Sequence, residues 1–142
     1  MIIFDLDGTL SIVGDRVKYL MQEKIDWDSV YKTCAEDKVS EPIAKIFRTL
    51  KSTGHRLKIV TGRHERARQK SLEWLERNNL SVADNDLHMR GDDDFRHDII
   101  VKPELIAEFK DQVEMIFEDR NSMVDTWREL GIVCLQVAEG NF

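Results

Sequence analysis

The chain opens with Met1-Ile2-Ile3-Phe4-Asp5-Leu6-Asp7-Gly8-Thr9-Leu10, an apolar run that leads into two carboxylates spaced two residues apart. The apolar run is typical of a buried strand, and Gly8 is typical of a tight loop after it. Residues 1–5 therefore predict a strand that presents Asp5 at its carboxyl end, where open α/β sheets bind their ligands. Two carboxylates crowded at that end repel each other unless a cation or a proton lies between them. The opening predicts a metal-assisted site with one ionised and one protonatable carboxylate.

Strand-like and helix-like segments alternate along the rest of the chain. Short apolar runs predict further strands over residues 57–60, 87–89, 113–117 and 132–137. Helices are expected to begin at Ser40-Glu41-Pro42, after Arg63, at Pro103 and at Asn121 or Ser122. This alternation favours a parallel sheet between two layers of helices. The predicted fold class is α/β, a three-layer sandwich with a mostly parallel Rossmann-like sheet.

Two of these helix predictions depend on single residues. The helix at Pro103 is placed after Lys102 because the residue before a proline disfavours helical backbone. The last helix takes Asn121 or Ser122 as its cap, ends at Gly131, and carries Val124, Trp127 and Leu130 on one face.

The chain of 142 residues is expected to form a single domain over residues 1–142. Residues 11–40 are mixed and polar without a clean period, so we expect them to form a small excursion over the site. Trp27, within this excursion, is either a core residue or an aromatic surface on which a base stacks.

The formal net charge of −6 argues against a broad phosphate-binding surface, because neutralising many phosphates requires clustered Lys and Arg. If the protein binds nucleic acid, we expect it to hold only an end. Some of the acidity is expected for another reason, because magnesium sites are built from carboxylates.

No apolar stretch approaches the length of a membrane span, and the two Asp residues of the opening exclude a signal peptide. A cytoplasmic location without membrane contact is therefore expected. Cys34 and Cys134 are far apart and predict buried free thiols rather than a disulfide or a zinc site. The histidines do not lie at metal-ligand spacing, and His64 is expected at the surface.

Four segments of the chain resemble the motifs of the haloacid dehalogenase (HAD) superfamily: Asp5-Leu6-Asp7-Gly8-Thr9, Thr61, Lys102-Pro103 and Glu118-Asp119. The resemblance implies that Asp5 is the nucleophile, forming an aspartyl-phosphate, and that Asp7 is the general acid and base. It implies that Thr61 donates a hydrogen bond to a phosphoryl oxygen and that Lys102 holds the phosphate.

The same resemblance implies a Mg²⁺ cofactor held by Asp5, by the backbone carbonyl of Asp7 and by Asp119. Many members of the superfamily have Asp where this chain has Glu118. Its longer side chain favours an indirect role, in which Glu118 orients the groups that bind the metal.

A narrower resemblance covers nearly the whole chain. Residues 119–142, with Thr61-Gly62-Arg63 and Asp98-Ile99-Ile100-Val101-Lys102, are similar to the phosphatase domains typified by bacteriophage polynucleotide kinase–phosphatase. That family removes phosphate from 3′ ends of nucleic acid or from 3′-nucleotides. The match implies that Thr61, Gly62, Arg63, Arg16 and Asp98 surround the substrate phosphate, since Arg clamps phosphate bidentately.

The resemblance therefore implies a magnesium-dependent phosphatase acting on 3′-phosphorylated DNA or RNA ends or nucleotides. No Gly-x-x-x-x-Gly-Lys-Ser/Thr motif occurs in the sequence, so 5′-phosphorylation is not expected and a separate kinase or ligase is the expected functional partner. If the gene is phage-encoded, the expected location is the host cytoplasm.

Two alternatives remain open at this point. The protein is a HAD phosphatase of free nucleotides or other small phosphate esters, which the acidic balance favours, or a catalytically silent module that binds phosphorylated ends. The second is disfavoured because Asp5, Asp7, Lys102 and Asp119 are all present. Dehalogenase activity is less favoured still, because dehalogenases of the superfamily generally lack Asp at the position of Asp7.

Overall fold

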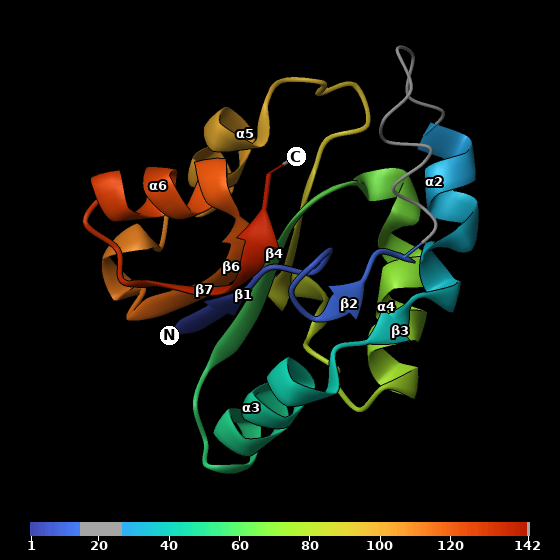
Figure 1. Cartoon of the computed structure of the whole chain (residues 1–142), viewed down its shortest axis with the longest axis horizontal. Coiled ribbons are helices and arrows are strands. Elements are labelled where there is room, and N and C mark those ends of the chain that lie inside the picture. The colour runs from blue at the N-terminus through green and yellow to red at the C-terminus, as the bar shows by residue number, and fades with distance from the viewer. Residues whose placement is uncertain (15–26, 142) are drawn as a thin grey trace.

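The structure, a computed structural model, describes residues 1–14 and 27–141. Its main sheet has five strands in the order β5-β4-β1-β6-β7. All neighbouring strands are parallel, with Phe4 of the central strand beside Ile59 on one side and Phe117 on the other. The strands are β1 (Ile2–Phe4), β4 (Leu57–His64), β5 (Leu87–Arg90), β6 (Met115–Arg120) and β7 (Cys134–Gly140). The predicted α/β class with a mostly parallel sheet is confirmed (Figure 1).

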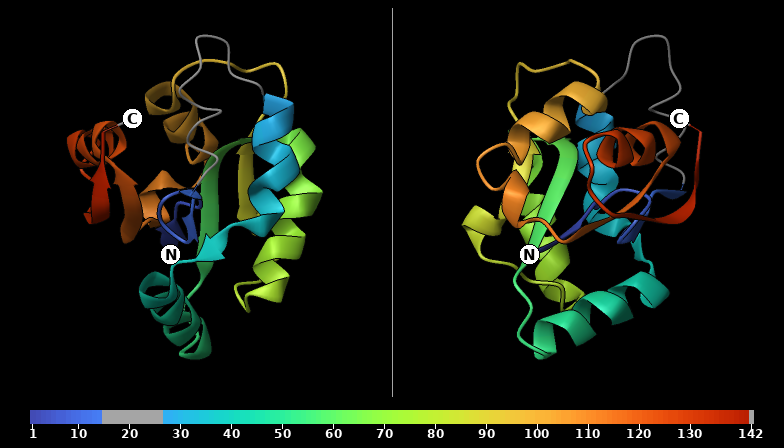
Figure 2. Two further views of the ribbon diagram at one scale, coloured as in Figure 1. Left: turned by 45° about the vertical axis from the view of Figure 1, so that its right-hand side comes forward. Right: turned by 90° about the vertical axis from the view of Figure 1, so that its left-hand side faces the viewer.

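Helices cover both faces of this sheet, as the two views of Figure 2 show. The helices are α2 (Trp27–Thr33), α3 (Glu41–Ser52), α4 (Arg68–Arg77), α5 (Asp98–Leu105) and α6 (Asn121–Glu129). Short 3-10 turns lie at Cys34–Glu36, Glu65–Ala67, Asp84–Asp86 and Lys110–Gln112. Helices α2, α3 and α4 pack in one buried cluster, and α5 and α6 flank the other.

The alternation of side chains along β1 explains the two layers. Ile2 and Phe4 belong to the cluster with α3 and α4, whereas Ile3 belongs to the cluster with α6. Successive side chains of a strand point to opposite faces, so a strand covered on both sides must be apolar throughout. The uninterrupted run before Asp5 meets this requirement, and the strand is buried along its whole length.

The excursion between β1 and α3 contains a small second sheet. Strand β2 (Ser11–Ile12) pairs antiparallel with β3 (Lys38–Val39), and α2 lies between them in sequence. Of the expected small excursion over residues 11–40, the structure thus describes residues 11–14 and 27–40. The predicted phosphate ligand Arg16 and the side chain of Trp27 lie outside the described residues.

Four strands end later in the chain than the sequence predicted. β5 ends one residue later, at Arg90, and β7 three residues later, at Gly140. The other two, β4 and β6, take in motif residues. β4 includes Thr61, Gly62, Arg63 and His64, and β6 includes Glu118-Asp119-Arg120. Each shows an irregular register near its carboxyl end, between Val60 and His64 in β4 and between Glu118 and Arg120 in β6. Motif residues expected just after the two strands are thus fixed by strand backbone, and the irregular register alters the direction of their side chains.

The helix predicted to begin at Pro103 is wrong in its position. Helix α5 begins at Asp98, and Pro103 lies inside it, two residues before its last residue. The His97 side chain accepts a hydrogen bond from the backbone N–H of Ile99 and caps the helix start. Proline in a helix interior removes one backbone hydrogen bond, which fits a helix that ends soon after it. Tertiary contacts of Asp98 and Lys102 outweigh this cost.

The last helix also differs in detail from its prediction. Arg120 is the residue at the cap position, and no side chain there makes a capping hydrogen bond, so neither Asn121 nor Ser122 is the cap. Val124 and Trp127 are buried as expected, whereas Leu130 lies after the helix and is exposed. Gly131 ends the segment with a φ of 78°, which suits glycine.

Cys34 and Cys134 are both free and buried, which confirms the expected thiol state. Burial raises the pKa of the Cys134 thiol to about 11, with the Glu118 carboxylate as a second cause. This thiol stays protonated at neutral pH, so it is a packing group rather than a nucleophile.

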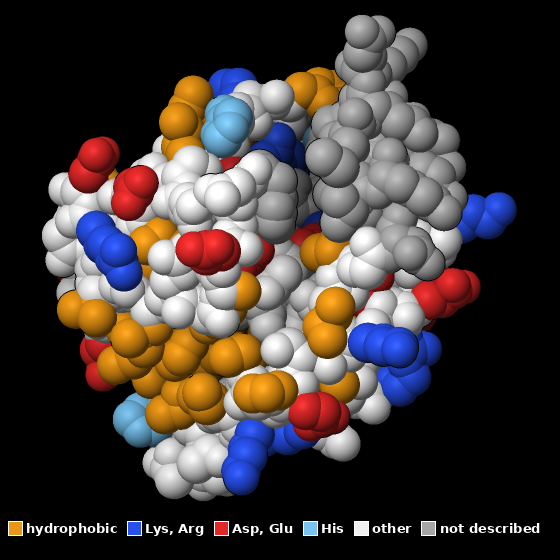
Figure 3. All heavy atoms as spheres, in the orientation of Figure 1, with side chains coloured by type: hydrophobic (Ala, Val, Ile, Leu, Met, Phe, Trp, Pro, Cys, Tyr) orange, Lys and Arg blue, Asp and Glu red, His pale blue; other side chains and the backbone are white. Residues whose placement is uncertain are grey.

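The visible surface in Figure 3 carries dispersed Lys and Arg side chains and no broad basic face. Hydrophobic side chains gather at its lower left, and the most exposed ones around β7 are Leu130, Val133 and Leu135. Within the described ranges, no helix combines the length and the apolar character needed to cross a membrane.

Phe4 gives a test of how much the central strand contributes to stability. Its ring is fully buried, stacks on Phe117 at 4.4 Å between centroids, and meets Phe47 edge-on at 5.1 Å. We expect Phe4→Ala to lower the free energy of unfolding by about 3–5 kcal/mol, measured by urea denaturation. Phe95→Ala is the matched control, because Phe95 is 62% exposed, and it should change stability by less than about 0.5 kcal/mol. Similar losses in the two variants would contradict this account of the core.

Candidate active site

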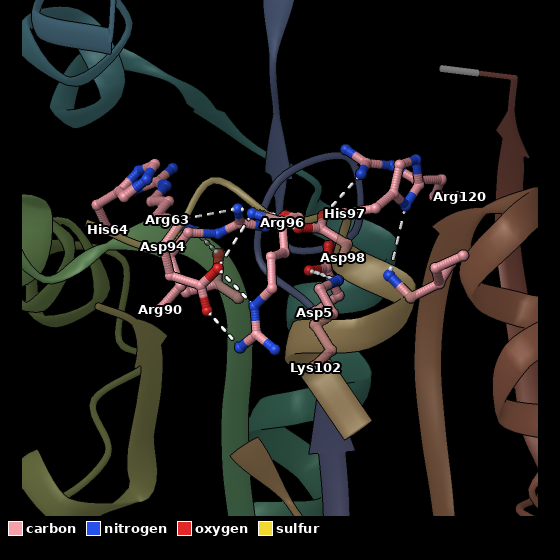
Figure 4. A network of polar contacts seen from close by, with 12 residues as sticks. Asp5, Arg63, His64, Arg90, Asp94, Arg96, His97, Asp98, Lys102 and Arg120 are labelled. Carbon is pink, nitrogen blue, oxygen red and sulfur yellow. Dashed lines mark hydrogen bonds and ion pairs between the residues drawn. The ribbon is translucent and has the colours of Figure 1, made fainter. Parts of the chain in front are cut away.

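Asp5 lies directly after β1, at the carboxyl edge of the sheet, and its carboxylate meets a buried lysine. The Lys102 ammonium donates hydrogen bonds to Asp5 Oδ1 at 2.7 Å and to Glu118 Oε2 at 2.8 Å. All three residues are almost completely buried. Burial lowers the pKa of Lys102, but the two carboxylates outweigh this and hold its pKa above the ordinary value. Lys102 is thus a fixed positive charge beside Asp5 (Figure 4).

Three buried carboxylates meet at this point. Asp5, Glu118 and Asp119 each offer an oxygen atom, and these atoms lie within 4.8 Å of one another. Burial and the charge of Glu118 raise the pKa of Asp119 to about 6. Burial first, and then Glu118, also raise the pKa of Asp5 well above its usual range, although Lys102 acts in the opposite direction. The cluster therefore carries more negative charge than Lys102 alone offsets.

The residues present fit a hard divalent cation. Asp5 Oδ2 is buried and has no hydrogen-bond partner in the described part of the chain, so one carboxylate oxygen is available at the centre of the cluster. Oxygen ligands from a few carboxylates are what Mg²⁺ binds. Glu118 has both oxygens occupied, one by Lys102 and the other by the backbone N–H of Asp119 at 3.2 Å, which suits an orienting role.

The loop after β1 closes tightly over Asp119. A Cβ atom at Gly8 would lie 2.1 Å from Asp119 Oδ2, and the φ of Gly8 is 95°. Both facts require glycine, because a side chain would overlap the carboxylate and the backbone conformation is unfavourable for other residues. Thr9 Oγ1 donates to Asp119 Oδ1 at 3.3 Å from the same loop. The Gly-Thr pair thus fits the loop against the carboxylate cluster.

The Asp7 carboxylate is held by Arg63. The Arg63 guanidinium donates to the two Asp7 carboxylate oxygens at 2.7 and 2.6 Å, and Ser11 Oγ donates to Asp7 at 3.2 Å. Arg63 also donates to Ser71 Oγ at 2.9 Å and lies 3.5 Å from an Asp37 oxygen. The bidentate pair fixes the direction of the Asp7 carboxyl group.

Thr61 and Gly62 directly precede Arg63 on β4. Thr61 Oγ1 accepts a hydrogen bond from the backbone N–H of Arg63 at 3.2 Å, so its hydroxyl hydrogen remains available to a ligand. A Cβ atom at Gly62 would lie 2.7 Å from an Asp98 carboxylate oxygen. Asp98 therefore rests on the bare backbone of Gly62, which requires glycine at this position.

Asp98 joins two arginines from different strands. Arg90, at the end of β5, donates to one Asp98 oxygen, and Arg120, at the end of β6, donates to the other at 2.6 Å. Figure 4 shows Asp98 between the two guanidinium groups. Asp98 thus holds the guanidinium groups of Arg90 and Arg120 at the carboxyl edge of the sheet.

The sequence did not indicate Arg90 as a site residue, because the predicted strand over residues 87–89 ends one residue before it. Its position at the end of residues 87–90 was the available signal, since functional groups of a parallel sheet gather at strand ends. Arg120 was noted only as part of the motif after Asp119. Nothing in the sequence indicated that Asp37 and Ser71 contact Arg63, because only the fold brings these residues together.

His64 lies in the interior, which corrects the expected surface position. It is fully buried, and its Nδ1 atom is hydrogen-bonded to the Tyr31 hydroxyl, which also accepts from the His64 backbone N–H at 3.1 Å. Burial lowers the pKa of His64 and raises that of Tyr31 to about 12. This pair fastens α2 to the end of β4.

Solved structures similar to this chain fall into two groups. Two are described as the Pnkp1/Rnl/Hen1 complex and as the Pnkp1/Rnl/Hen1 RNA repair complex, with TM-scores of 0.82 and 0.84 and 32% sequence identity to each. The matches cover 99% of this chain but 46% and 43% of those chains. This chain thus spans less than half the length of the chains it matches there.

The second group shares the fold at lower identity. It includes a putative phosphatase from Clostridium difficile, with a TM-score of 0.62 and 17% identity over 95% of this chain and 83% of that chain. A haloacid dehalogenase-like family hydrolase from Streptococcus pneumoniae has a TM-score of 0.61 and 19% identity, covering 95% of this chain and 82% of that chain. These matches support the HAD-like fold.

The family described as "Polynucleotide kinase PNKP phosphatase domain" matches residues 1–142, the full length of the sequence. Together with the carboxylate cluster at the tip of β1, this identifies a phosphatase of the HAD type. The chain belongs to the PNKP phosphatase domain family.

Proposed function

We propose that the protein is a Mg²⁺-dependent phosphomonoesterase that removes 3′-phosphate from nucleic-acid ends or 3′-nucleotides through an aspartyl-phosphate intermediate. The observation that carries this proposal is the buried Asp5 carboxylate beside Asp119. One of its oxygens accepts from Lys102, and the other has no hydrogen-bond partner among residues 1–14 and 27–141. An oxygen fixed in this way at a strand tip, next to a fixed positive charge, suits in-line attack on phosphorus.

In the first step, an Asp5 carboxylate oxygen attacks phosphorus and the bond from phosphorus to the ester oxygen breaks. The leaving oxygen takes a proton from the Asp7 carboxyl group. Lys102 offsets the charge of the phosphoryl group as it moves onto Asp5. Arg63 positions Asp7, because its two hydrogen bonds set the direction of that carboxyl group.

In the second step, water attacks the phosphorus of the aspartyl-phosphate and gives a proton to Asp7. The bond between phosphorus and the Asp5 oxygen breaks, which releases inorganic phosphate and restores the carboxylate. The Thr61 hydroxyl, whose oxygen accepts from Arg63, donates to a phosphoryl oxygen in both steps.

Mg²⁺, held by Asp5, Asp119 and the Asp7 backbone carbonyl, would neutralise the negative charge of the phosphoryl oxygens when bound. Glu118 orients Lys102 and the backbone of Asp119 through its own hydrogen bonds. Asp98 repels phosphate by its charge, so its role is to position Arg90 and Arg120 at the rim of the site.

The similarity to chains of a Pnkp1/Rnl/Hen1 RNA repair complex supports a polynucleotide end as substrate, and a functional link to a separate kinase or ligase. The net charge of −6 and the scattered Lys and Arg side chains on the face shown in Figure 3 support contact with an end rather than with a long duplex. The predicted location is cytoplasmic.

A substrate panel tests this function. We expect phosphate release with Mg²⁺ from a 3′-phosphorylated oligonucleotide and from 3′-mononucleotides, with kcat/KM at least about tenfold above that for 5′-phosphorylated counterparts. Higher activity on 5′-mononucleotides or simple phosphate esters would instead favour a small-ester phosphatase. Absence of release from every member would favour a binding module.

Asp5→Asn should abolish turnover, because an amide is a poor nucleophile and cannot form the acyl phosphate. We expect kcat to fall by at least about 10³-fold while the folded state persists, measured by phosphate release and circular dichroism. Asp125→Asn on the exposed surface of α6 is the matched control and should keep full activity. Retained activity in Asp5→Asn would exclude Asp5 as the nucleophile.

Asp119 should make the stability of the metal-free protein depend on pH. Its pKa of about 6 in the folded state exceeds the usual 3.8, so the folded state holds a proton that the unfolded state has released. Stability therefore falls as pH rises from about 4 to about 6, and Asp119→Asn removes this contribution. The measurement is the thermal midpoint against pH with chelator present.

Adding MgCl₂ extends the same experiment. Well above pH 6, Mg²⁺ should raise the thermal midpoint of the wild type, because a ligand that binds only the folded state stabilises it. The increase should be smaller below pH 4 and in Asp119→Asn. An equal increase in the wild type and in Asp119→Asn would show that the cation binds elsewhere.

A further inference from the structure

Phe95 is an exposed aromatic side chain at the rim of the active site. It lies in the segment between β5 and α5 and is 62% exposed. Among the large hydrophobic side chains exposed in the described ranges, Phe95 is the only aromatic one. Its neighbours in sequence are Asp93, Asp94, Arg96 and His97. The exposed ring therefore offers a flat, uncharged surface on which another ring can stack.

The backbone around Phe95 is rigidly held. Arg90 Nη1 donates to the carbonyl oxygens of Asp94 at 3.1 Å and Arg96 at 2.8 Å, the residues on either side of Phe95. Arg96 in turn donates to the Asp94 carboxylate at 2.8 and 3.0 Å and to Glu104 at 2.7 and 3.0 Å. Because these contacts already fix the segment, little conformational entropy of the chain is lost when a ligand binds to the ring.

The same contacts connect Phe95 to the phosphate site. Arg90 also binds Asp98, whose carboxylate rests on Gly62 and pairs with Arg120. A second contact comes from β4, where the centroid of the His64 ring lies 5.3 Å from that of Phe95. Arg63, the residue before His64, donates to Asp7. Figure 4 includes Asp94 and Arg96, the residues on either side of Phe95, in the same network as Arg90 and Asp98. Phe95 therefore lies at the carboxyl edge of the sheet, after β5 and beside the end of β4 that carries Arg63 and His64.

The position of Asp7 indicates which part of a substrate lies nearby. If Asp7 protonates the leaving oxygen, the nucleoside that carries this oxygen must lie on the side of Asp7 and Arg63. His64 supports one side of the Phe95 ring, in a tilted contact at 47°, and solvent borders the rest. Bases stack on such rings without regard to sequence, because every base has a π-face.

We propose that Phe95 stacks on the base of the nucleotide that carries the scissile phosphate, and so selects nucleotide ends over baseless phosphate esters. The inference rests on the proposed function. Arg90 is a positioning residue in this arrangement, since it holds the backbone on both sides of Phe95.

The test compares two oligonucleotides that differ only at the 3′-phosphorylated nucleotide, one with a normal base and one abasic. We expect Phe95→Ala to lower kcat/KM on the normal end by about 5- to 100-fold and to leave the abasic end unchanged. Phe95→Trp should retain wild-type activity on the normal end, because indole also stacks. Val133→Ala, which truncates an equally exposed side chain near β7, is the control and should match the wild type on both substrates.

A binding measurement separates this inference from the proposed activity. In an Asp5→Asn, Phe95→Trp double variant, the normal 3′-phosphorylated end should quench the new indole fluorescence, and the abasic end should not. This signal needs no turnover, so it decides the inference even if the wild type releases no phosphate. Equal losses of Phe95→Ala on both oligonucleotides, or no quenching by either end, would overturn the proposal.

Discussion

The structure of the site depends on one buried ion pair. Lys102 reaches from α5 into the carboxyl edge of the sheet and donates to Asp5 and Glu118, residues from the ends of two different strand segments. A buried ammonium would be costly alone, and the crowded carboxylates would be costly without it. Each therefore requires the other, and together they tie α5, β1 and β6 to one point.

The position of α5 follows from this constraint. Pro103 lies in the helix interior, where it weakens the backbone hydrogen bonding, yet the helix begins five residues earlier. Starting at Asp98 gives Asp98 and Lys102, four residues apart, the same face of the helix. One side chain then reaches the arginines over Gly62, and the other reaches Asp5. The charge contacts of both residues outweigh the local preference of proline.

The arginines of the site act mainly through acidic partners. Arg63 is occupied by Asp7, and Asp98 joins Arg90 to Arg120. Such pairing keeps guanidinium groups fixed without turning the surface basic, which agrees with a net charge of −6. Under the proposed function, such a site would bind the phosphate of an end and offer little to a long nucleic-acid backbone. In the arrangement we propose, the exposed ring of Phe95 would add a stacking contact with a base, which the charged groups do not provide.

The sequence by itself determined the class of the fold and the positions of the strands, because apolar runs of strand length between helical patterns admit few arrangements. It also placed Asp5 at the end of a strand, where ligands of a parallel sheet bind, and the resemblance to the HAD motifs pointed to Lys102 and Asp119. The start of α5, the burial of His64, and the partners of Arg63 and Asp98 were decided only by the tertiary structure. These features depend on contacts between residues distant in the chain, and the energy of such contacts exceeds the local preferences that a sequence displays.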